Sequence, residues 1–195
     1  FAESDPVLPN RWRHGVIARS GGAGHARDLV SGRLFTTGGR RQVYIFDHVQ
    51  GAKTDAVVVA VQVPEAPAGL IVEFWLASVP FTPDSGLDLL GSVGVRYAFV
   101  DMGAARLMLT SQLGRACDDL GSDIPVAWLE QHWMLAAAPV GAPPARLERL
   151  LRALGEVADQ LEVLGGDGSF TSPAAAPQPR ENREDTGRPD RSFLR

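Results

Sequence analysis

Three arginines, one aspartate and one histidine gather in residues 29–48, and they are the side chains there with the most capacity for chemistry. Arg33 and Arg41 are candidate contacts for anionic groups, and Asp47 beside His48 is the one adjacent pair of an acid and an imidazole. In nucleophilic catalysis an acid orients the imidazole that takes the proton. Neighbouring residues of a strand point to opposite faces, however, so Asp47 and His48 cannot orient each other directly. The pattern therefore gives no catalytic pair.

The other residues with reactive or ligating side chains do not complete a site. Cys117 falls on the apolar side of a predicted helix, which favours a buried thiol over a nucleophile. Gly22 and Gly24 complete no phosphate-binding frame, and residues 118–123 lack the frame of a calcium loop. The histidines, none of them at metal-ligand spacing, are His14, His25, His48 and His132. We predict a protein that is not an enzyme and that carries no metal or cofactor.

Residues 29–48 predict a β-hairpin. Two short runs rich in β-branched and aromatic residues, 29–35 and 41–48, meet across a glycine turn. Gly38 and Gly39 can supply the positive φ that a tight turn requires.

Five further segments have the character of strands. Residues 56–63 are almost entirely Val and Ala, as in a central strand that is covered on both faces. The other four are residues 70–76, 95–100, 126–130 and 133–138, of which the last two form a hairpin around Gln131 and His132. Residues 80–94 are polar and rich in glycine, so we expect a long connection there. The sheet should be antiparallel, with about six or seven strands.

A long amphipathic helix gives the strongest periodic signal. Residues 145–164 carry a stripe of Leu, Val and Ala, with prolines before the segment and glycines after it. Shorter helices are predicted after Asp101, whose carboxylate can cap the next turn, and over residues 111–120. The predicted fold is a single α+β domain in which the long C-terminal helix and the shorter helices pack on the sheet.

Composition divides the chain into three parts. Of 195 residues 45% are apolar, enough for one core, and the single cysteine excludes an internal disulfide. Residues 1–25 are expected to be an irregular lead-in, residues 26–164 the core domain, and residues 165–195 a disordered low-complexity tail with too few apolar residues to fold. Because the chain begins with Phe1 rather than Met, a signal or membrane anchor could precede it.

The N-terminal part is basic, whereas the body is acidic. Residues 1–41 carry seven arginines against three acidic residues, a balance of +4, and residues 42–164 carry seven basic and fifteen acidic residues, a balance of −8. There is no basic stripe of the kind that binds nucleic acid. A basic segment beside a membrane anchor is attracted to anionic lipids, although solvated charge without a partner explains it equally well. The residues assigned to a candidate partner-binding or membrane-near surface are Arg11, Trp12, Arg13, Arg33 and Arg41.

The elements in this order resemble a family of actinobacterial membrane-anchored proteins. The resemblance covers about residues 5–162, and its motifs are apolar patterns with a few polar markers. It is carried by residues 8–12, the pair Gly32 and Arg33, residues 40–47, 57–64 and 95–101 with the helix that follows, Leu109, Thr110, Trp128 and the helix over residues 147–161.

The resemblance implies a non-enzymatic accessory role in the transport of trehalose monomycolate, a mycolic acid glycolipid, to the cell envelope. The implied partners are an RND-family transporter and associated envelope-assembly proteins. A single transmembrane helix ahead of residue 1 would anchor the protein in the inner membrane, with the soluble domain on the cytoplasmic face. The family has no catalytic motif that could be placed on this chain.

Two mechanisms stay open at this level. In the first, the surface of the domain docks on the membrane transporter. In the second, the domain binds a glycolipid and holds its acyl chain between the sheet and the helices. A continuous apolar cavity of several hundred Å³ would favour the second mechanism, and a filled core would favour the first.

Overall fold

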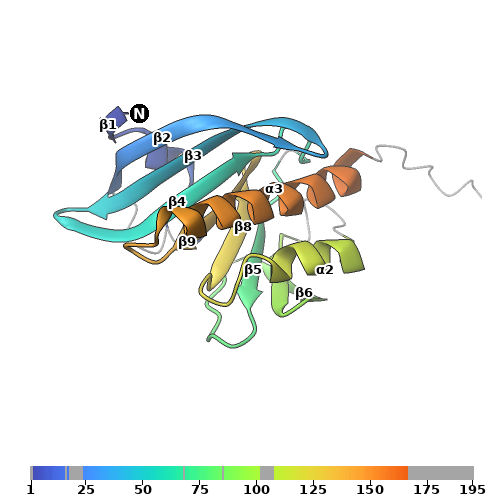
Figure 1. Ribbon diagram of the computed structural model, residues 1–195. Coiled ribbons are helices and arrows are strands. Elements are labelled where there is room, and N and C mark those ends of the chain that lie inside the picture. The colour runs from blue at the N-terminus through green and yellow to red at the C-terminus, as the bar shows by residue number, and fades with distance from the viewer. Residues whose placement is uncertain are drawn as a thin grey trace, which may run out of the picture.

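A single antiparallel sheet forms the body of the structure (Figure 1). The computed structural model describes residues 2–15, 17, 24–67, 69–84, 86–101 and 108–166. Within these residues the sheet has nine strands in the order β1-β2-β3-β4-β9-β8-β5-β7-β6, and every neighbouring pair is antiparallel. The strands are β1 (Ala2–Asp5), β2 (Gly24–Thr36), β3 (Gly39–Gln50), β4 (Lys53–Gln62), β5 (Val72–Leu76), β6 (Asp88–Val93), β7 (Arg96–Val100), β8 (Val126–Glu130) and β9 (Trp133–Ala138). The described residues also form the 3-10 helix η1 (Leu8–Arg11) and the helices α2 (Ser111–Asp118) and α3 (Pro144–Gly166).

Helices α2 and α3 cover one face of the sheet, which we call the helix face (Figure 1). The buried stripe of α3 is the one predicted from the sequence, because Leu150, Leu154 and Leu161 all pack into this core. Alternate residues of the central strands meet the stripe, among them Val59 of β4 and its partner Ala136 of β9. These side chains have no exposed area, so the apolar strands form a packed layer against the helices.

The N-terminal segment covers the opposite face, which we call the N-terminal face. Trp12 stacks on Phe46 of β3, with 6.0 Å between the ring centroids. Glu130, at the end of β8, accepts hydrogen bonds from the backbone N–H groups of Arg13 and His14 at 2.7 to 2.9 Å. The stacking of Trp12 and the hydrogen bonds to Glu130 together hold this segment on the sheet.

The prediction of six or seven strands is wrong, because it misses β1 and β6. β1 lies in the lead-in that we expected to be irregular, and it has only four residues, two of them acidic. β6 lies in the expected connection over residues 80–94, and its register shifts between Leu89 and Gly91. Both are edge strands. A very short strand, or one interrupted by a glycine bulge, lacks the regular alternation from which strands are recognised.

The long helix and the helix over residues 111–120 form where the sequence predicts them. Thr110 caps α2, because its hydroxyl accepts a hydrogen bond from the N–H of Leu113. The helix predicted after Asp101 falls on residues 102–107, which lie outside the described residues, as does most of the predicted tail, residues 167–195. In the described part of the chain, no helix combines the length and the apolar character needed to cross a membrane.

The α3 stripe gives a stability test. We expect Leu154→Ala to lower the free energy of unfolding by about 2–5 kcal/mol, because Leu154 is fully buried and its truncation leaves a cavity. Urea denaturation followed by circular dichroism measures the change. Arg149→Ala, at an exposed position of the same helix, is the control and should change the value by no more than about 0.5 kcal/mol. Equal midpoints for the two variants would contradict the packing of α3 described above.

Candidate functional site

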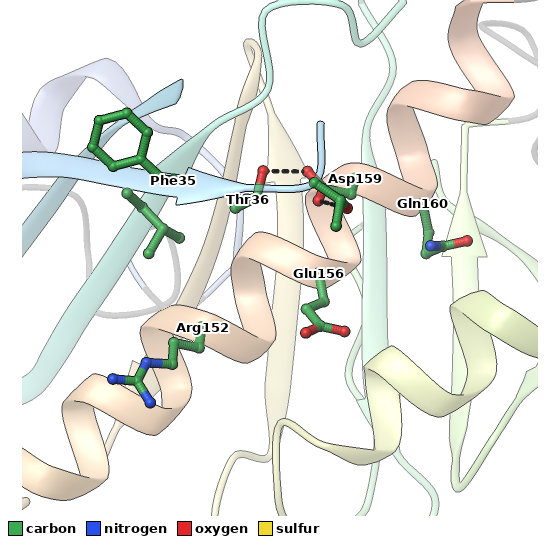
Figure 2. A pocket seen from close by; sticks show the side chains of 8 residues that line it. Phe35, Thr36, Arg152, Glu156, Asp159 and Gln160 are labelled. Carbon is green, nitrogen blue, oxygen red and sulfur yellow. Dashed lines mark hydrogen bonds between the residues drawn. The ribbon is translucent and has the colours of Figure 1, made fainter. Parts of the chain in front are cut away.

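A recess of about 270 Å³ opens between the tip of the β2–β3 hairpin and helix α3 (Figure 2). It is lined by Leu34, Phe35, Thr36 and Thr37 of the hairpin and by Arg152, Glu156, Asp159 and Gln160 of α3. Glu156 follows Arg152 by four positions, and Asp159 and Gln160 follow Glu156 by three and four, so the helical residues share one side of the helix. We take this recess as the candidate functional site, since it combines apolar and charged groups from two parts of the chain that lie far apart in sequence.

A buried ion pair joins the hairpin to the helix beside the recess. The Nη2 and Nε atoms of Arg41 lie 2.6 Å and 3.0 Å from Oδ1 of Asp159, and both side chains are almost fully buried. The Nη1 atom of Arg41 donates to the backbone carbonyl of Gln62 at 3.0 Å. Such a charge-assisted contact is strong only when the geometry is good and the remaining donors are used, and both conditions are met here.

Asp159 also holds the turn of the hairpin. Its carboxylate accepts hydrogen bonds from the hydroxyl of Thr36 at 2.7 Å, the hydroxyl of Thr37 at 2.6 Å and the N–H of Gly38 at 3.0 Å. Burial alone would raise the pKa of Asp159, but these bonds, together with the Arg41 guanidinium, outweigh it and hold the pKa below its usual value. Its oxygens are therefore engaged in structure, and Asp159 is a poor candidate for a general base.

The glycines of the turn allow this close contact. Thr36 pairs with Gly39, so residues 37 and 38 form a two-residue turn, and Gly39 has the predicted positive φ, at 123°. A Cβ atom on Gly38 would lie 2.6 Å from Oδ1 of Asp159, so a side chain there would collide with the carboxylate. The positive φ is predictable from the sequence. The need for a glycine at position 38 is not, because it arises from the contact with Asp159 of α3, more than a hundred residues away.

The outer wall of the recess is polar and open to solvent. Arg152 pairs with Glu148 one turn earlier on α3, and Glu156 is exposed. Gln160, next along the helix, is half-buried. These side chains can contact polar or charged groups of a partner. The arrangement is suited to binding, because the buried carboxylate of the site is already saturated with hydrogen bonds.

The structure exposes three of the five residues assigned to a partner-binding or membrane-near surface and buries two. Arg11, Arg13 and Arg33 are exposed. Trp12 and Arg41 are each only 2% exposed, so their assignment to a surface is wrong. Trp12 packs into the core of the N-terminal face, and Arg41 needs its buried position to reach α3. Whether the other three contact a partner or a membrane stays a prediction.

The alternation of strand residues explains why Arg33 and Arg41 do not come together. Leu34 pairs with Arg41 on the helix face, whereas Arg33 pairs with Gln42 on the other face of the hairpin. Sequence reasoning also missed Asp159, the residue on which the site depends. Its acidic side chain lies beside the apolar stripe of a predicted helix, and no local pattern distinguishes it from a solvated residue.

Asp47 and His48 lie on opposite faces, as the sequence predicts. Asp47 accepts a hydrogen bond from Nη2 of Arg27 at 3.3 Å, whereas His48 is fully buried, with Nδ1 4.0 Å from Oδ2 of Asp55. Burial lowers the pKa of His48, although Asp55 opposes the shift, so the imidazole is neutral at physiological pH. Neither ring nitrogen of His48 has a hydrogen-bond partner.

Cys117 is fully buried in the core of the helix face, as expected of a packed thiol. Burial raises its pKa to about 12, with Arg96 opposing the shift. The thiol is therefore protonated and is not a nucleophile. Among the residues that the structure describes, His, Cys, Asp and Glu side chains do not assemble in groups of three or more that could hold a metal ion.

The fold and the recess define a class: an α+β domain with one broad antiparallel sheet, two helices on one face and an N-terminal segment on the other. The sequence matches the model of the trehalose monomycolate transport factor TtfA family over residues 2–193, and the chain belongs to this family. The resemblance to a family of trehalose monomycolate transport is thus confirmed, whereas the membrane anchor that it implies stays a prediction.

A solved structure from the same family is similar in fold. The crystal structure of the mycobacterial trehalose monomycolate transport factor A, TtfA, aligns with a TM-score of 0.70 and 25% sequence identity, over 84% of this chain and 86% of that chain. A search of curated proteins finds no match. The family assignment therefore rests on the family model and on this structure.

We expect Asp159→Asn to lower the free energy of unfolding by about 3–5 kcal/mol at neutral pH, because it leaves the buried Arg41 charge unpaired. The wild-type carboxylate has a lowered pKa, so its contribution is present above the unfolded pKa near 4 and is lost as the pH falls through the folded pKa. The difference between variant and wild type should therefore shrink in acid. Urea denaturation as a function of pH measures it.

Glu156→Gln is the matched control for this prediction. Glu156 lies on the same helix and lines the same recess, but it is exposed. Its replacement should change the free energy of unfolding by no more than about 0.5 kcal/mol. An effect of Asp159→Asn as small as that of the control would show that the ion pair does not hold the hairpin.

Proposed function

We propose that this chain is a non-enzymatic accessory factor for the transport of trehalose monomycolate and that it acts by binding an RND-type membrane transporter. Membership of the transport factor family, over residues 2–193, is the observation that carries the proposal. The solved protein of similar fold is named as a transport factor for the same glycolipid. A factor that assists a transporter needs a shaped and stable surface rather than a reactive group.

The candidate site supports this mode of action. Its buried charged residues, Arg41 and Asp159, form an ion pair that joins the hairpin to the helix. The outer wall of the recess is formed by Arg152, Glu156 and Gln160. A partner can contact the outer wall without any rearrangement of the buried pair. We assign the recess to the transporter or to an associated envelope-assembly protein.

The proposal includes a place in the cell. We infer a helical anchor in the inner membrane ahead of residue 1 and a domain on the cytoplasmic face. The direction of β1 indicates where such an anchor would join the domain, because Ala2 pairs with Leu29 and Asp5 with Ala26. Chain ahead of Ala2 would thus leave the sheet toward the tip of the β2–β3 hairpin, where Arg33 is exposed.

Storage of a glycolipid acyl chain between the sheet and the helices is the alternative. The packing of the helix face argues against it, since Val59 of β4, Ala136 of β9 and Leu154 of α3 are fully buried in one core. The recess of about 270 Å³ lies at the rim of this core and has charged residues in its lining. Docking through the surface is therefore the better-supported mechanism.

Crosslinking of the full-length protein in membranes, followed by affinity purification and mass spectrometry, tests the proposal. We expect an RND-family transporter among the crosslinked partners, and depletion of the protein should cause trehalose monomycolate to accumulate inside the cell. If no transporter component is recovered and export is unchanged, the proposed function is wrong.

The recess can be tested in the same experiment. Glu156→Arg reverses a charge on its outer wall, and we expect the recovery of the transporter to fall at least about tenfold, because like or misplaced charges at an interface disrupt docking. Glu65→Arg, an exposed position in the connection between β4 and β5, makes the same change of charge elsewhere. Equal recovery with both variants would place the docking surface away from the recess.

A further inference from the structure

The tip of the β2–β3 hairpin carries a second surface, on the side opposite to Leu34 and Thr36, whose side chains lie against α3. Phe35 belongs to this surface and also borders the recess at its rim. Arg33 and Phe35 alternate along β2 and therefore point to the same side, and Phe35 pairs directly with Arg40 of β3. The Cζ atom of Arg40 lies 5.6 Å from the centroid of the Phe35 ring. We call these three residues the tip patch. Arg40 was not singled out from the sequence, because its membership depends on the register of the hairpin.

The tip patch is exposed and carries unpaired positive charge. Phe35 is 76% exposed, the highest fraction among the large apolar residues that the structure shows as exposed. Arg33 and Arg40 are also exposed, and the ion pairs of the described residues include neither of them. The chain as a whole has a net charge of −4, whereas the patch places two cations beside an aromatic ring.

The patch stands clear of the rest of the sheet. The pairing of β3 with β4 begins at Val43, and the pairing of β1 with β2 ends at Leu29. Within the described part of the chain, the end of the hairpin therefore has no further strand on either side. Underneath, Arg41 and the turn residues are fixed to Asp159 of α3. The tip is thus a convex projection with a rigid base, and it can present Phe35 without first becoming ordered.

We propose that the tip patch docks on the surface of an anionic lipid bilayer, with Phe35 entering the interface between headgroups and acyl chains and with Arg33 and Arg40 contacting lipid phosphates. Two cations beside an exposed aromatic ring match the charge and the polarity gradient of such a surface. A stable protein interface buries roughly 800 Å² on each partner, usually around a pocket, and a narrow convex tip with three side chains offers neither. This inference does not depend on the transport role.

Binding to vesicles tests the proposal directly. The chain is mixed with vesicles of phosphatidylcholine alone or of equal amounts of phosphatidylcholine and phosphatidylglycerol, and the bound fraction is measured by flotation at low and high salt. We expect binding to the anionic vesicles only, and weaker binding at high salt because salt screens the arginines. The double variant Arg33→Gln/Arg40→Gln should bind roughly 30-fold more weakly, since each arginine near an anionic surface contributes about a factor of five.

A matched variant separates the patch from net charge. Arg115→Gln/Arg149→Gln removes two exposed arginines from the helices α2 and α3 and changes the charge of the chain by the same amount. It should bind the anionic vesicles as the wild type does. Thermal unfolding of both double variants should match the wild type, because all four side chains lie on the surface.

Phe35→Trp reports insertion itself. The four natural tryptophans are buried or half-buried, so a tryptophan at position 35 adds an exposed fluorophore. Its emission should shift to the blue on addition of anionic vesicles and stay unchanged with neutral ones, and Phe35→Ser should weaken binding.

Three outcomes would overturn the proposal. The first is a wild type that binds neither type of vesicle, and the second is an equal loss of binding in both double variants. The third is vesicle binding that is unchanged in the variants of the tip patch, combined with the loss of a crosslinked membrane protein in the same variants. This result would identify the tip patch as a protein contact. Because the assay contains no transporter and no glycolipid, failure here leaves the proposed transport role untouched, and failure of the crosslinking experiment leaves this inference standing.

Discussion

The buried ion pair between Arg41 and Asp159 is the constraint on which the arrangement of the hairpin depends. The tip of the β2–β3 hairpin extends beyond the strand pairs that flank it, so backbone hydrogen bonds to the sheet cannot fix it. A single carboxylate on α3 does so instead, by accepting bonds from a guanidinium, two hydroxyls and one backbone N–H. Both the recess and the exposed side of the tip take their position from this contact.

The two faces of the sheet are closed by different means. On the helix face, α3 lays its apolar stripe across the central strands, and the layer is held by burial of aliphatic side chains. On the N-terminal face, aromatic stacking of Trp12 on Phe46 is combined with the charged anchor between Glu130 and the backbone of residues 13 and 14. Burial raises the pKa of Glu130, although the two N–H bonds oppose the shift. The desolvation of the carboxylate therefore offsets part of the stability that these hydrogen bonds contribute.

Periodicity predicted the parts of the fold that repeat. The stripe of α3 and the runs of β3, β4, β8 and β9 have enough regular apolar residues to be recognised in isolation. β6 could not be recognised, because a bulge at Gly91 breaks its alternation. The candidate site was harder still. Arg41 and Asp159 are separated by more than a hundred residues, so only the packing of α3 across the sheet shows that one neutralises the other.

The buried charged side chains of this domain are held by hydrogen bonds within the fold. In the described residues the buried charged side chains include Arg41, Arg96 and Glu130, and each is satisfied within the fold. Arg96, for example, donates to three backbone carbonyls around the end of α2 at 2.8 to 3.0 Å. Groups held so firmly cannot shift their protons or bonds during a reaction without loss of stability. The side chains that stay available, such as Glu156 and Arg40, lie on the outside, where they are open to contact.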